Sequence, residues 1–423
     1  MEFLWECIAT GLFLLAAGAL FLRWLAQSGV KLKAPFSDPL PRRPGEEPER
    51  ARLLAIFICT LLFRLLFAIG GLLLYNILSG TGAGLSDLPQ LWMRWDAQHY
   101  VKLAELGYSG YIEDGKPLFL VFFPLYVWLT RAAAWFIPNT ALAGLAVSAA
   151  CFAGGCVYLY RLAAEEYGER VALRTLALLC AFPFAFFFGG IMTESLFFLT
   201  TAAGLYHIRK HQWFRFALWG VLAAMTRMQG VLLIGAAVAE LCCWVKPFIQ
   251  GERGRIGYAA KRLPLLCLPG VGSLIYFVLN YHVTGNPFAF TVMQEHWSQG
   301  FMWFPKVLSY MAKNSFTWPN VLTRWEMWLP ELLLFPIFAA LLWRSWKKHR
   351  SMLTLYAFVY FILTYCLSWL LSAGRYLSCA LPCFLFAGDE LEGRPRLTAV
   401  LLTLMAVLQA VLLYRYFCWG QVM

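Results

Sequence analysis

Charged residues are scarce in this 423-residue chain, at 14% of the total, whereas 61% of its residues are hydrophobic. Soluble domains carry about 25% charged residues, so the composition excludes an ordinary soluble protein. The apolar residues form many separate runs, several of them close to the roughly 20 residues that cross a bilayer core. Runs such as 12–22 do not alternate between polar and apolar residues, which argues against a transmembrane β-barrel. The sequence therefore predicts an all-α, polytopic membrane protein.

Motifs that bind soluble nucleotides or metals are also lacking. The chain has no Gly-x-Gly-x-x-Gly, no Walker lysine motif and no Asp-x-Asp pair. No loop is long enough for a nucleotide-binding domain, because each βαβ unit needs about 30 residues. The 12 cysteines lie mostly inside apolar runs without zinc-ligand spacing, so we expect buried thiols and no disulfide framework. We therefore predict no metal site and no cofactor.

The apolar runs predict about 11 to 13 membrane spans, several of them short. A single integral membrane domain over 1–423 is expected, with an N-terminal helix and a basic, Pro-rich linker in 1–52 and the core in 53–423. No internal repeat or separate soluble domain is indicated. The candidate spans are 3–26, 53–78, 118–137, 141–160, 171–190, 194–208, 213–226, 230–249, 263–281, 330–346, 351–371, 376–388 and 397–417.

Basic residues set the predicted orientation. The net charge of +12 is concentrated in short loops between apolar runs, which is the bias of cytosolic loops and not of a nucleic-acid-binding surface. Anionic membrane lipids are the expected electrostatic partner. The loops predicted to be cytosolic are 27–52, 161–174, 208–215, 250–262 and 344–350, which leaves 79–117 and 282–329 on the opposite face.

One inconsistency remains in this topology. Two candidate spans, 118–137 and 141–160, separate the first outer loop from the basic residues near Arg161. Two crossings would return the chain to the wrong face. Either 118–137 does not cross the membrane completely, or one short span is misassigned.

The first outer loop carries an acidic residue, Asp96, directly before a predicted amphipathic helix over 97–106. Such a helix lies in the membrane interface, and Gly107 is suited to end it. Asp96 would stand at its N-terminus, with His99 one turn further on. Two interpretations of Asp96 remain open at this point, a reactive carboxylate or a simple helix N-cap. The apolar face of this helix is formed by Ala97, Tyr100, Val101 and Ala104.

Three short turns carry further polar residues to the same predicted face: 192–195 with Glu194, 226–230 with Arg227, and 372–376 with Arg375. Each turn by itself is equally typical of helix capping or of an interface anchor. Taken together with Asp96, they place carboxylates and arginines beneath the lipid headgroups. Arginine binds phosphate through two parallel hydrogen bonds, so the combination indicates a phosphate-bearing substrate.

The second outer loop contains Gln294, His296 and Trp297. Aromatic rings beside amide and imidazole groups are suited to stack on a sugar, but they are equally typical of an aromatic belt at the headgroup level. Arg64 lies in the middle of the second candidate span. A cation at that depth is expected to face the protein interior or a cavity, with a carboxylate or a lipid phosphate as its partner.

These motifs together resemble the PIG-V family, the second mannosyltransferase of glycosylphosphatidylinositol assembly, over about residues 50–390. The shorter bacterial relatives of that family are the more similar ones, since this chain lacks the longer insertions of eukaryotic members. The matching motifs are Arg94-Trp95-Asp96-Ala-Gln-His99-Tyr, Phe122-Phe-Pro-Leu-Tyr126, Thr193-Glu194-Ser195, Thr226-Arg227-x-x-Gly230, Gln294-x-His296-Trp297 and Gly374-Arg375-Tyr376.

The resemblance implies a fold of the GT-C class and transfer of a hexose, mannose by analogy, from a polyprenyl-phosphate donor to a lipid or glycan acceptor. The reaction would be inverting and metal-independent, on the extracytosolic face of a bacterial cytoplasmic membrane, or of the endoplasmic reticulum in a eukaryote. Asp96 would be the catalytic base, with Glu194 as a second acid if two are used. The residues expected to bind substrate are Arg94, Trp95, His99, Tyr108, Glu194, Arg227, Gln294, His296, Trp297, Arg375 and Tyr376.

Three other functions remain open at the level of sequence. The first is a flippase or transporter for lipid-linked sugars, although the chain lacks the two similar halves that are common in transporters. The second is a polysaccharide polymerase or ligase of the same membrane. The third is a catalytically inactive relative that binds lipid. The sequence indicates no particular protein partner.

Overall fold

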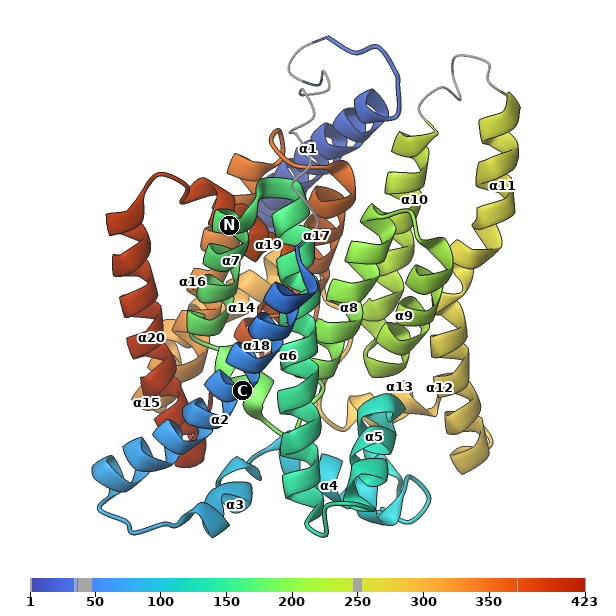
Figure 1. Cartoon of the computed structure of the whole chain (residues 1–423). Coiled ribbons are helices and arrows are strands. Elements are labelled where there is room, and N and C mark those ends of the chain that lie inside the picture. The colour runs from blue at the N-terminus through green and yellow to red at the C-terminus, as the bar shows by residue number, and fades with distance from the viewer. Residues whose placement is uncertain (1, 34–35, 37–47, 246–252, 371, 423) are drawn as a thin grey trace.

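The structure, a computed structural model, describes residues 2–33, 36, 48–245, 253–370 and 372–422. The side chains of residues 2 and 253–256 are outside the described part as well. Figure 1 shows a bundle of helices of very different lengths. Among the described residues there are two isolated β-bridges and no strand, so the all-α prediction is confirmed.

The longer helices are α1 (Glu2–Gln27), α2 (Arg50–Ser79), α6 (Thr140–Tyr167), α7 (Glu169–Ala181), α8 (Glu194–Arg209), α9 (Trp213–Thr226), α10 (Leu232–Trp244), α11 (Arg253–Cys267), α12 (Pro269–Thr284), α14 (Phe304–Thr317), α16 (Leu329–Ser345), α17 (Ser351–Thr364) and α20 (Pro395–Phe417). Shorter segments connect them: η1 (Leu85–Asp87), α3 (Leu88–Trp92), α4 (Asp96–Leu106), η2 (Leu118–Val121), α5 (Pro124–Ala134), η3 (Ala185–Gly189), η4 (Met228–Val231), α13 (Ala289–Glu295), α15 (Val321–Thr323), η6 (Arg324–Trp328), α18 (Ala373–Leu377) and α19 (Leu381–Glu390).

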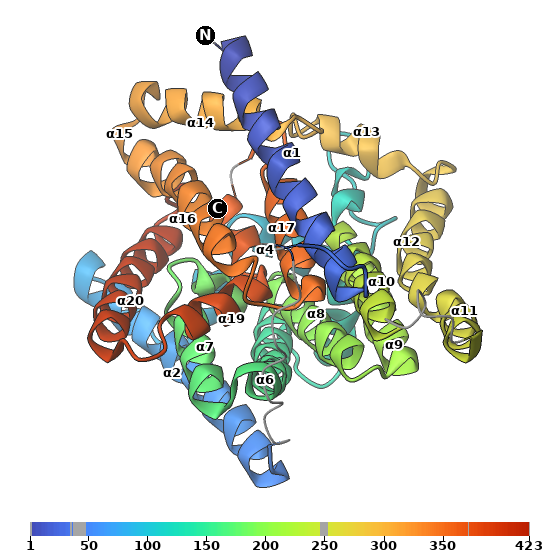
Figure 2. The same cartoon turned by 90° about the horizontal axis from the view of Figure 1, so that it is seen from above.

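Six helical segments of the described chain are long and apolar enough to cross a membrane, which supports a multi-pass membrane protein. They are 3–27, 50–79, 140–167, 257–284, 321–345 and 395–417. Shorter apolar helices, including α9, α10 and α17, pack among them. Six of the 13 candidate spans thus coincide with helices of membrane-spanning length among the described residues, and the total of 11 to 13 crossings stays a prediction. Viewed along the bundle (Figure 2), α13 and α14 are seen from the side, because they lie across its axis.

The bundle has two chemically different ends. At one end, which we call the basic end, Glu166 at the close of α6 pairs with Arg209 of α8 and with Arg350, which precedes α17. Arg350 Nη1 also lies 3.8 Å from a carboxylate oxygen of Glu240 on α10. At the opposite end, which we call the α4 end, both long polar segments contact the ring of Phe119. His99 of segment 79–117 stacks on that ring, and Trp297 of segment 282–329 packs against it. The described basic residues near Arg209 and Arg350 thus lie at the end opposite to the rings of the two polar segments, as the charge pattern predicted. Residues 34–35 and 37–47 of the predicted basic linker 27–52 and the start of the loop 250–262 lie outside the described residues.

The structure resolves the inconsistency around residues 118–160. The predicted span 118–137 is wrong, because this stretch folds as the short turn η2 and the 11-residue helix α5. Helix α5 stays at the α4 end, where Arg131 donates a hydrogen bond to the carbonyl oxygen of Ala104 at 2.6 Å. Tyr126 of α5 reaches only the first turns of α6, where its hydroxyl donates to the carbonyl oxygen of Gly144. Helix α6 alone therefore carries the chain to the basic end.

Helix α4 forms where the sequence predicted it, over Asp96–Leu106. Gly107 follows it with a φ of 78°, a conformation that glycine adopts without strain. The predicted apolar face of α4 is buried, and so is Leu103. This face packs against α5 and α6. The rings of Tyr100 and Tyr126 meet edge to face, with their centres 5.3 Å apart. The face comprises Ala97, Tyr100, Val101 and Ala104.

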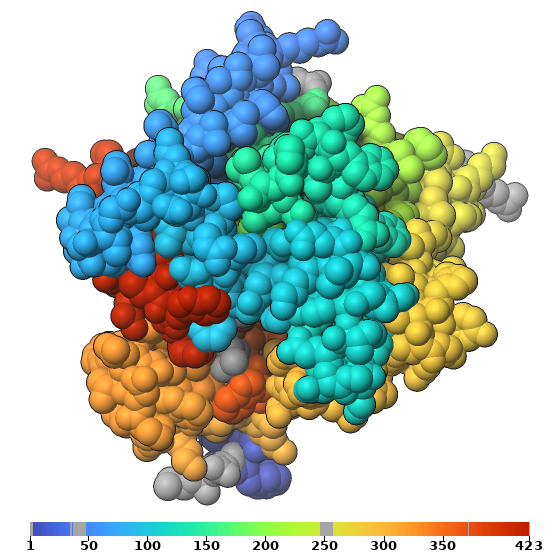
Figure 3. All heavy atoms as spheres, turned by 90° about the horizontal axis from the view of Figure 1, so that it is seen from below, coloured from blue at the N-terminus to red at the C-terminus, as the bar shows by residue number. Residues whose placement is uncertain are grey.

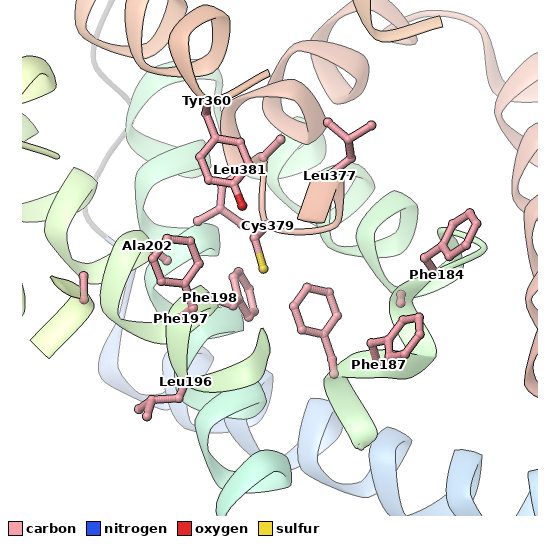
Figure 4. Packing of buried hydrophobic residues seen from close by; sticks show 14 of the residues in the cluster. Phe184, Phe187, Leu196, Phe197, Phe198, Ala202, Tyr360, Leu377, Cys379 and Leu381 are labelled. Atoms are coloured by element: carbon pink, nitrogen blue, oxygen red, sulfur yellow. The ribbon is translucent and has the colours of Figure 1, made fainter. Parts of the chain in front are cut away.

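A core of aromatic and aliphatic side chains fills the space behind the start of α8. Figure 4 shows Phe197 and Phe198 of α8 together with Tyr360 and Cys379 from the C-terminal half of the chain. All four side chains are almost completely buried. This packing holds the N-terminus of α8 rigidly in the middle of the bundle, because a close-packed interior leaves little room for movement.

Arg64 faces the protein interior, as its depth in the second span predicted. Its Nη2 donates to the carbonyl oxygen of Ala185 at 2.7 Å, and its guanidinium lies 4.4 Å from the ring centre of Phe152. Among the described residues no carboxylate pairs with it. Arg64 therefore supports the backbone of η3, and the expected carboxylate partner is not found.

The cysteines are unbridged, as predicted, and all 12 are free. Cys151, Cys156 and three others are buried in the core. Cys7, Cys59 and Cys267 instead lie on the outer surface of the bundle, so the expectation of burial holds for only part of the set.

The α6–α8 interface generates a first prediction. A Cβ atom added at Gly155 of α6 would lie 2.5 Å from the ring of Phe198, which is fully buried and has no free space to enter. We expect Gly155→Ala to lower the free energy of unfolding by about 1–3 kcal/mol through overpacking. Thermal unfolding in detergent measures the effect. Gly70→Ala on α2, where a Cβ meets nothing within 4 Å, is the matched control; equal stability of the two variants would contradict the proposed tight contact.

Candidate functional site

Four charged side chains from distant parts of the chain form one cluster near the α4 end. Arg375 Nη1 donates to Asp96 Oδ2 at 2.6 Å, and Arg375 Nε donates to Glu194 Oε1. Arg227 Nη2 donates to the same Glu194 oxygen, while Arg227 Nε donates to Thr193 Oγ1 at 2.8 Å. Glu194 is completely inaccessible, at 0% exposure, and both arginines are buried. Two carboxylates and two guanidinium groups therefore balance each other's charge, with Glu194 at the centre.

Local backbone geometry directs the two arginines toward Glu194. Arg227 adopts an extended conformation between α9 and η4, and Gly230 brings the following turn directly against α9. A Cβ atom at Gly230 would overlap the backbone of Ala223 and Ala224, so only glycine fits there. Gly374 likewise lies against the ring of Phe184. The glycines in both arginine-bearing turns thus permit a close approach that brings the guanidinium groups inward.

Asp96 is not a helix N-cap in this structure. It is the first residue of α4, no side chain caps that helix, and the Asp96 carboxylate is instead bonded to Arg375. The Asp96 side chain is 29% exposed, in contrast to Glu194. Only Oδ2 has a hydrogen-bond partner among the described residues. Asp96 therefore presents a partly free carboxylate beside a buried cation.

Trp95 holds a strained backbone conformation directly before Asp96, with φ 51° and ψ −126°. A bulky residue in this region costs on the order of 1–3 kcal/mol, which the surrounding contacts must offset. The C-terminal segment supplies these contacts. Arg94 Nε donates to the carbonyl oxygen of Phe417 at 3.0 Å, and the hydroxyl of Tyr416 donates to the carbonyl oxygen of Arg94 at 3.3 Å. Trp419 packs edge to face against Trp95, with ring centres 5.8 Å apart.

A layer of stacked rings extends outward from α4. His99 stacks on Phe119 with centroids 4.0 Å apart, and Tyr111 stacks on the same ring at 4.5 Å. The Nδ1 atom of His99 and the hydroxyl of Tyr111 are 2.8 Å apart. Trp297 from the second polar segment packs on Phe119 at 5.8 Å. Two of the predicted substrate-binding residues, His99 and Trp297, are therefore joined through an aromatic ring that sequence reasoning did not select.

Burial changes the acidity of His99. Partial burial lowers the pKa of His99 below its ordinary value, while the negative charges of Asp96 and Glu113 partly oppose this effect. The imidazole is therefore neutral near pH 7. Hydrogen bonding to Tyr111 occupies one ring nitrogen of this neutral form.

The remaining predicted residues do not all join the cluster. Tyr376 does join the cluster, because its ring centre lies 5.2 Å from the guanidinium carbon of Arg227. Tyr108 does not contact the cluster through its hydroxyl, because this group donates a hydrogen bond to the carbonyl oxygen of Phe122 at 2.8 Å. Gln294 and His296 lie at the end of α13, and no hydrogen bond or ion pair links them to the four charged residues. Their predicted grouping with Asp96 is thus not observed in this structure.

Sequence reasoning missed Glu331, a fully buried acid on α16. Its Oε1 accepts the backbone N–H of Ala373 at 2.9 Å, two residues before Arg375. The hydroxyl of Tyr365 donates to the carbonyl oxygen of Glu331 at 2.7 Å. Glu331 therefore holds the turn that presents Arg375. Its signal in the sequence is an acid at the start of an otherwise apolar span, which is costly unless it has a specific partner.

The surface around the cluster is built from several segments. Seen from the α4 end (Figure 3), the light-blue and cyan residues that follow α2 meet the red C-terminal residues and the orange residues around α14 and α15. Among the described residues no group of three or more His, Cys, Asp or Glu side chains is arranged to hold a metal ion.

Comparisons with known proteins identify the fold. The sequence matches no protein-family profile and no curated protein. Similar solved structures include ArnT from Cupriavidus metallidurans bound to undecaprenyl phosphate, with a TM-score of 0.51, 17% sequence identity, and coverage of 82% of this chain and 63% of that chain. The apo state of the same ArnT is similar at a TM-score of 0.48 and 15% identity, covering 84% of this chain and 77% of that chain.

This likeness shows a shared fold of the GT-C class, as predicted. The chain spans 63% of the length of the lipid-bound ArnT that it matches. At this level of identity the likeness concerns the arrangement of helices alone. The resemblance to PIG-V stays a prediction.

Removal of the central carboxylate tests the charge balance of the cluster. In Glu194→Gln, Arg227 and Arg375 lose the anion between them and remain buried. We expect a loss of about 3–5 kcal/mol in the free energy of unfolding, because an uncompensated buried charge is very costly. Thermal unfolding of the purified protein measures this loss. Glu105→Gln, an exposed carboxylate on α4, is the control; if both variants unfold at the wild-type temperature, Glu194 does not hold the cluster together.

His99 generates a prediction about pH. Because the pKa of His99 is lower in the folded protein than in the unfolded chain, the unfolded state binds the proton more tightly. The contribution of His99 to stability is therefore complete above the ordinary imidazole pKa of about 6.5 and is lost as pH falls below it. Between neutral pH and about pH 5, we expect the unfolding temperature of the wild type to fall more than that of His99→Gln. The exposed His282 provides the control, His282→Gln; a wild-type pH response in His99→Gln would contradict this assignment.

Proposed function

We propose that this protein is a membrane glycosyltransferase that moves a hexose from a polyprenyl-phosphate donor to a lipid or glycan acceptor. The observation that carries the proposal is the partly exposed Asp96 carboxylate, bonded to a buried arginine that is itself anchored on Glu194. The shared fold with ArnT supports it, since one ArnT structure holds undecaprenyl phosphate. The positive charge at the opposite end supports a site on the extracytosolic side of the membrane.

Asp96 acts as the general base. The acceptor hydroxyl attacks the anomeric carbon of the donor sugar, the bond from that carbon to the phosphate oxygen breaks, and the hydroxyl proton passes to the carboxylate of Asp96. One displacement of this kind inverts the anomeric configuration. The oxygen of Asp96 without a hydrogen-bond partner is the one available for the proton, because Arg375 occupies the other.

Arg375 links proton uptake by Asp96 to stabilisation of the leaving phosphate. While Asp96 is ionised, the guanidinium of Arg375 is shared between Asp96 and Glu194. When Asp96 takes up the proton, its hold on Arg375 weakens, and the cation is free to stabilise the negative charge developing on the departing polyprenyl phosphate. Arg227, which donates to the same Glu194 oxygen as Arg375, assists. Preorganised cations are effective here because they need no rearrangement during the reaction.

Glu194 is a positioning residue in this mechanism and not a second base. It has no exposed surface, and one of its oxygens receives both guanidinium groups. The ring layer of His99, Phe119 and Trp297 offers a surface on which a sugar stacks. We assign mannose as the hexose from the resemblance to PIG-V, together with metal-independent chemistry. Apolar helices beside the cluster would hold the polyprenyl tail and exclude water, which protects the donor from hydrolysis.

An Asp96→Asn variant tests the proposal. Asparagine keeps the shape of the side chain but accepts no proton, so we expect transfer to fall by about 10²- to 10⁴-fold. The measurement is incorporation of radiolabelled mannose from polyprenyl-phosphate mannose into the lipid and glycan fractions of membranes that contain the full chain. Wild-type turnover in Asp96→Asn would remove Asp96 from the chemistry.

Asp114→Asn is the matched control, since Asp114 lies exposed in the same polar segment and asparagine tolerates its positive φ of 51°. Its transfer rate should equal that of the wild type. Crosslinking with a photoreactive polyprenyl-phosphate sugar adds a second readout. A lipid transporter would capture this probe in both variants without forming product in either, and that result would exclude transfer.

A further inference from the structure

A second polar site lies at the basic end, remote from Asp96. Helix α8 separates the two, because Glu194 begins it and His211 follows its last turn. Its 16 residues span about 24 Å at 1.5 Å per residue. Here a pocket of about 500 Å³ opens between the start of α9 and the middle of α11. The residues that line it are His211, Gln212, Trp213, Phe214, Arg215, Tyr258, Lys261, Arg262 and Leu265.

The pocket has an unbalanced positive charge. Arg215, Lys261 and Arg262 line it, and no carboxylate does. Among the described residues, no acidic side chain lies within ion-pair distance of these three cations. This sets them apart from Arg209 and Arg350 at the same end, both of which pair with Glu166. His211, which also lines the pocket, lies 3.1 Å from Glu240, and an imidazole carries no negative charge that could balance these cations.

Hydrogen bonds and ring contacts hold the walls of the pocket in place. Trp213 Nε1 on α9 donates to the hydroxyl of Tyr258 on α11 at 3.0 Å, which ties the two helices together. The guanidinium of Arg262 lies 4.3 Å from the ring centre of Tyr258. Arg215 Nη1 donates to the side-chain oxygen of Gln212 at 3.1 Å. Two of the three cations are therefore already oriented before any ligand binds, which lowers the entropy cost of binding.

An apolar surface continues from the pocket along α9. Phe214, which lines the pocket, is 62% exposed, and Leu218, one turn further along α9, is 52% exposed. Residues four apart lie on the same side of a helix. In a protein that spans a membrane, such side chains face acyl chains. The pocket thus combines cations at the membrane surface with an apolar path leading into the bilayer.

We infer that this pocket binds a phosphate-bearing anion, and that the ligand is the headgroup of an anionic phospholipid whose acyl chains lie along Phe214 and Leu218. The chemistry is that of a phosphodiester held by one lysine and two arginines, which supply strong charge-assisted hydrogen bonds. An ordered lipid at this position would brace α11 against α9. The inference is independent of the glycosyl-transfer proposal, because it involves none of the residues around Asp96.

Native mass spectrometry of the full chain in detergent, titrated with dioleoyl phosphatidylglycerol, tests the inference. We expect the double substitution Lys261→Gln and Arg262→Gln to weaken phosphatidylglycerol binding by about 10-fold or more, through loss of two charge-assisted contacts. Dioleoyl phosphatidylcholine, which has no net charge, should bind the wild type and this variant equally weakly. The conservative pair Lys261→Arg and Arg262→Lys should retain binding, and Arg215→Gln on the opposite wall should weaken it in the same direction.

The matched control removes the same charges elsewhere at the basic end, with Lys347→Gln and Arg396→Gln, both exposed and outside the pocket. It should bind phosphatidylglycerol as the wild type does. Equal losses in the two double variants would overturn the inference, since they would show a diffuse attraction of the whole basic end. Inorganic phosphate supplies the last arm. If it binds as tightly as phosphatidylglycerol, with the same dependence on Lys261 and Arg262, the ligand is a soluble phosphate and the lipid assignment is wrong.

Discussion

The sharing of one buried carboxylate, Glu194, by two arginines is the interaction on which the rest of the structure depends. A single buried charge is unstable in a protein interior, and it persists only where its partners come with good geometry. Arg227 and Arg375 both donate to the same oxygen of Glu194, and Arg375 extends the contact to Asp96. As a result, the start of α8, the turn after α9, helix α18 and helix α4 are tied to a common point. Loss of any one of these elements would leave charge uncompensated in the others.

The contacts around this cluster show how a strained backbone geometry is held in place. Trp95 occupies a backbone region that a bulky residue rarely enters, and the C-terminal residues Tyr416, Phe417 and Trp419 hold the segment on either side of it. Glu331 does the same for the turn that carries Arg375. Both supports come from the last quarter of the chain, whereas Asp96 lies in the first quarter. The site is therefore complete only when the two ends of the chain have packed together.

The two ends of the bundle differ in how their charges are paired. At the α4 end the charges are paired within the cluster, and one ring from each of the two polar segments, His99 and Trp297, contacts Phe119. At the basic end some cations pair with Glu166 and Glu240, while those of the pocket between α9 and α11 remain unbalanced. Balanced charge beside a partly exposed carboxylate is suited to proton transfer. Unbalanced positive charge at the membrane surface is suited to holding lipid, so the two ends of the scaffold offer chemically different surfaces.

Local patterns in the sequence were sufficient for the class of protein, the amphipathic helix α4 and the residue types of the cluster. Each of these follows from short-range rules. The length of an apolar run identifies a span, and a 3.6-residue period identifies the buried face of α4. Charged residues in apolar surroundings are conspicuous because their burial costs free energy unless they are paired. The same rules did not detect that 118–137 turns back as α5, because apolar composition does not distinguish a crossing helix from one packed at the end of a bundle.

Tertiary structure decided which of the predicted residues meet. Arg375 is 279 positions from Asp96 and 181 from Glu194, and no local pattern reports a contact over such distances. Folding also separated residues that the sequence had assigned to one substrate site. Tyr108 donates a hydrogen bond to the backbone of Phe122, and Gln294 and His296 lie at the end of α13, apart from the cluster. The supporting roles of Glu331 and Trp419 likewise depend on how distant helices pack. Composition and periodicity thus determine the type of each segment, whereas the contact of Asp96 and Glu194 with their arginines depends on the path of the whole chain.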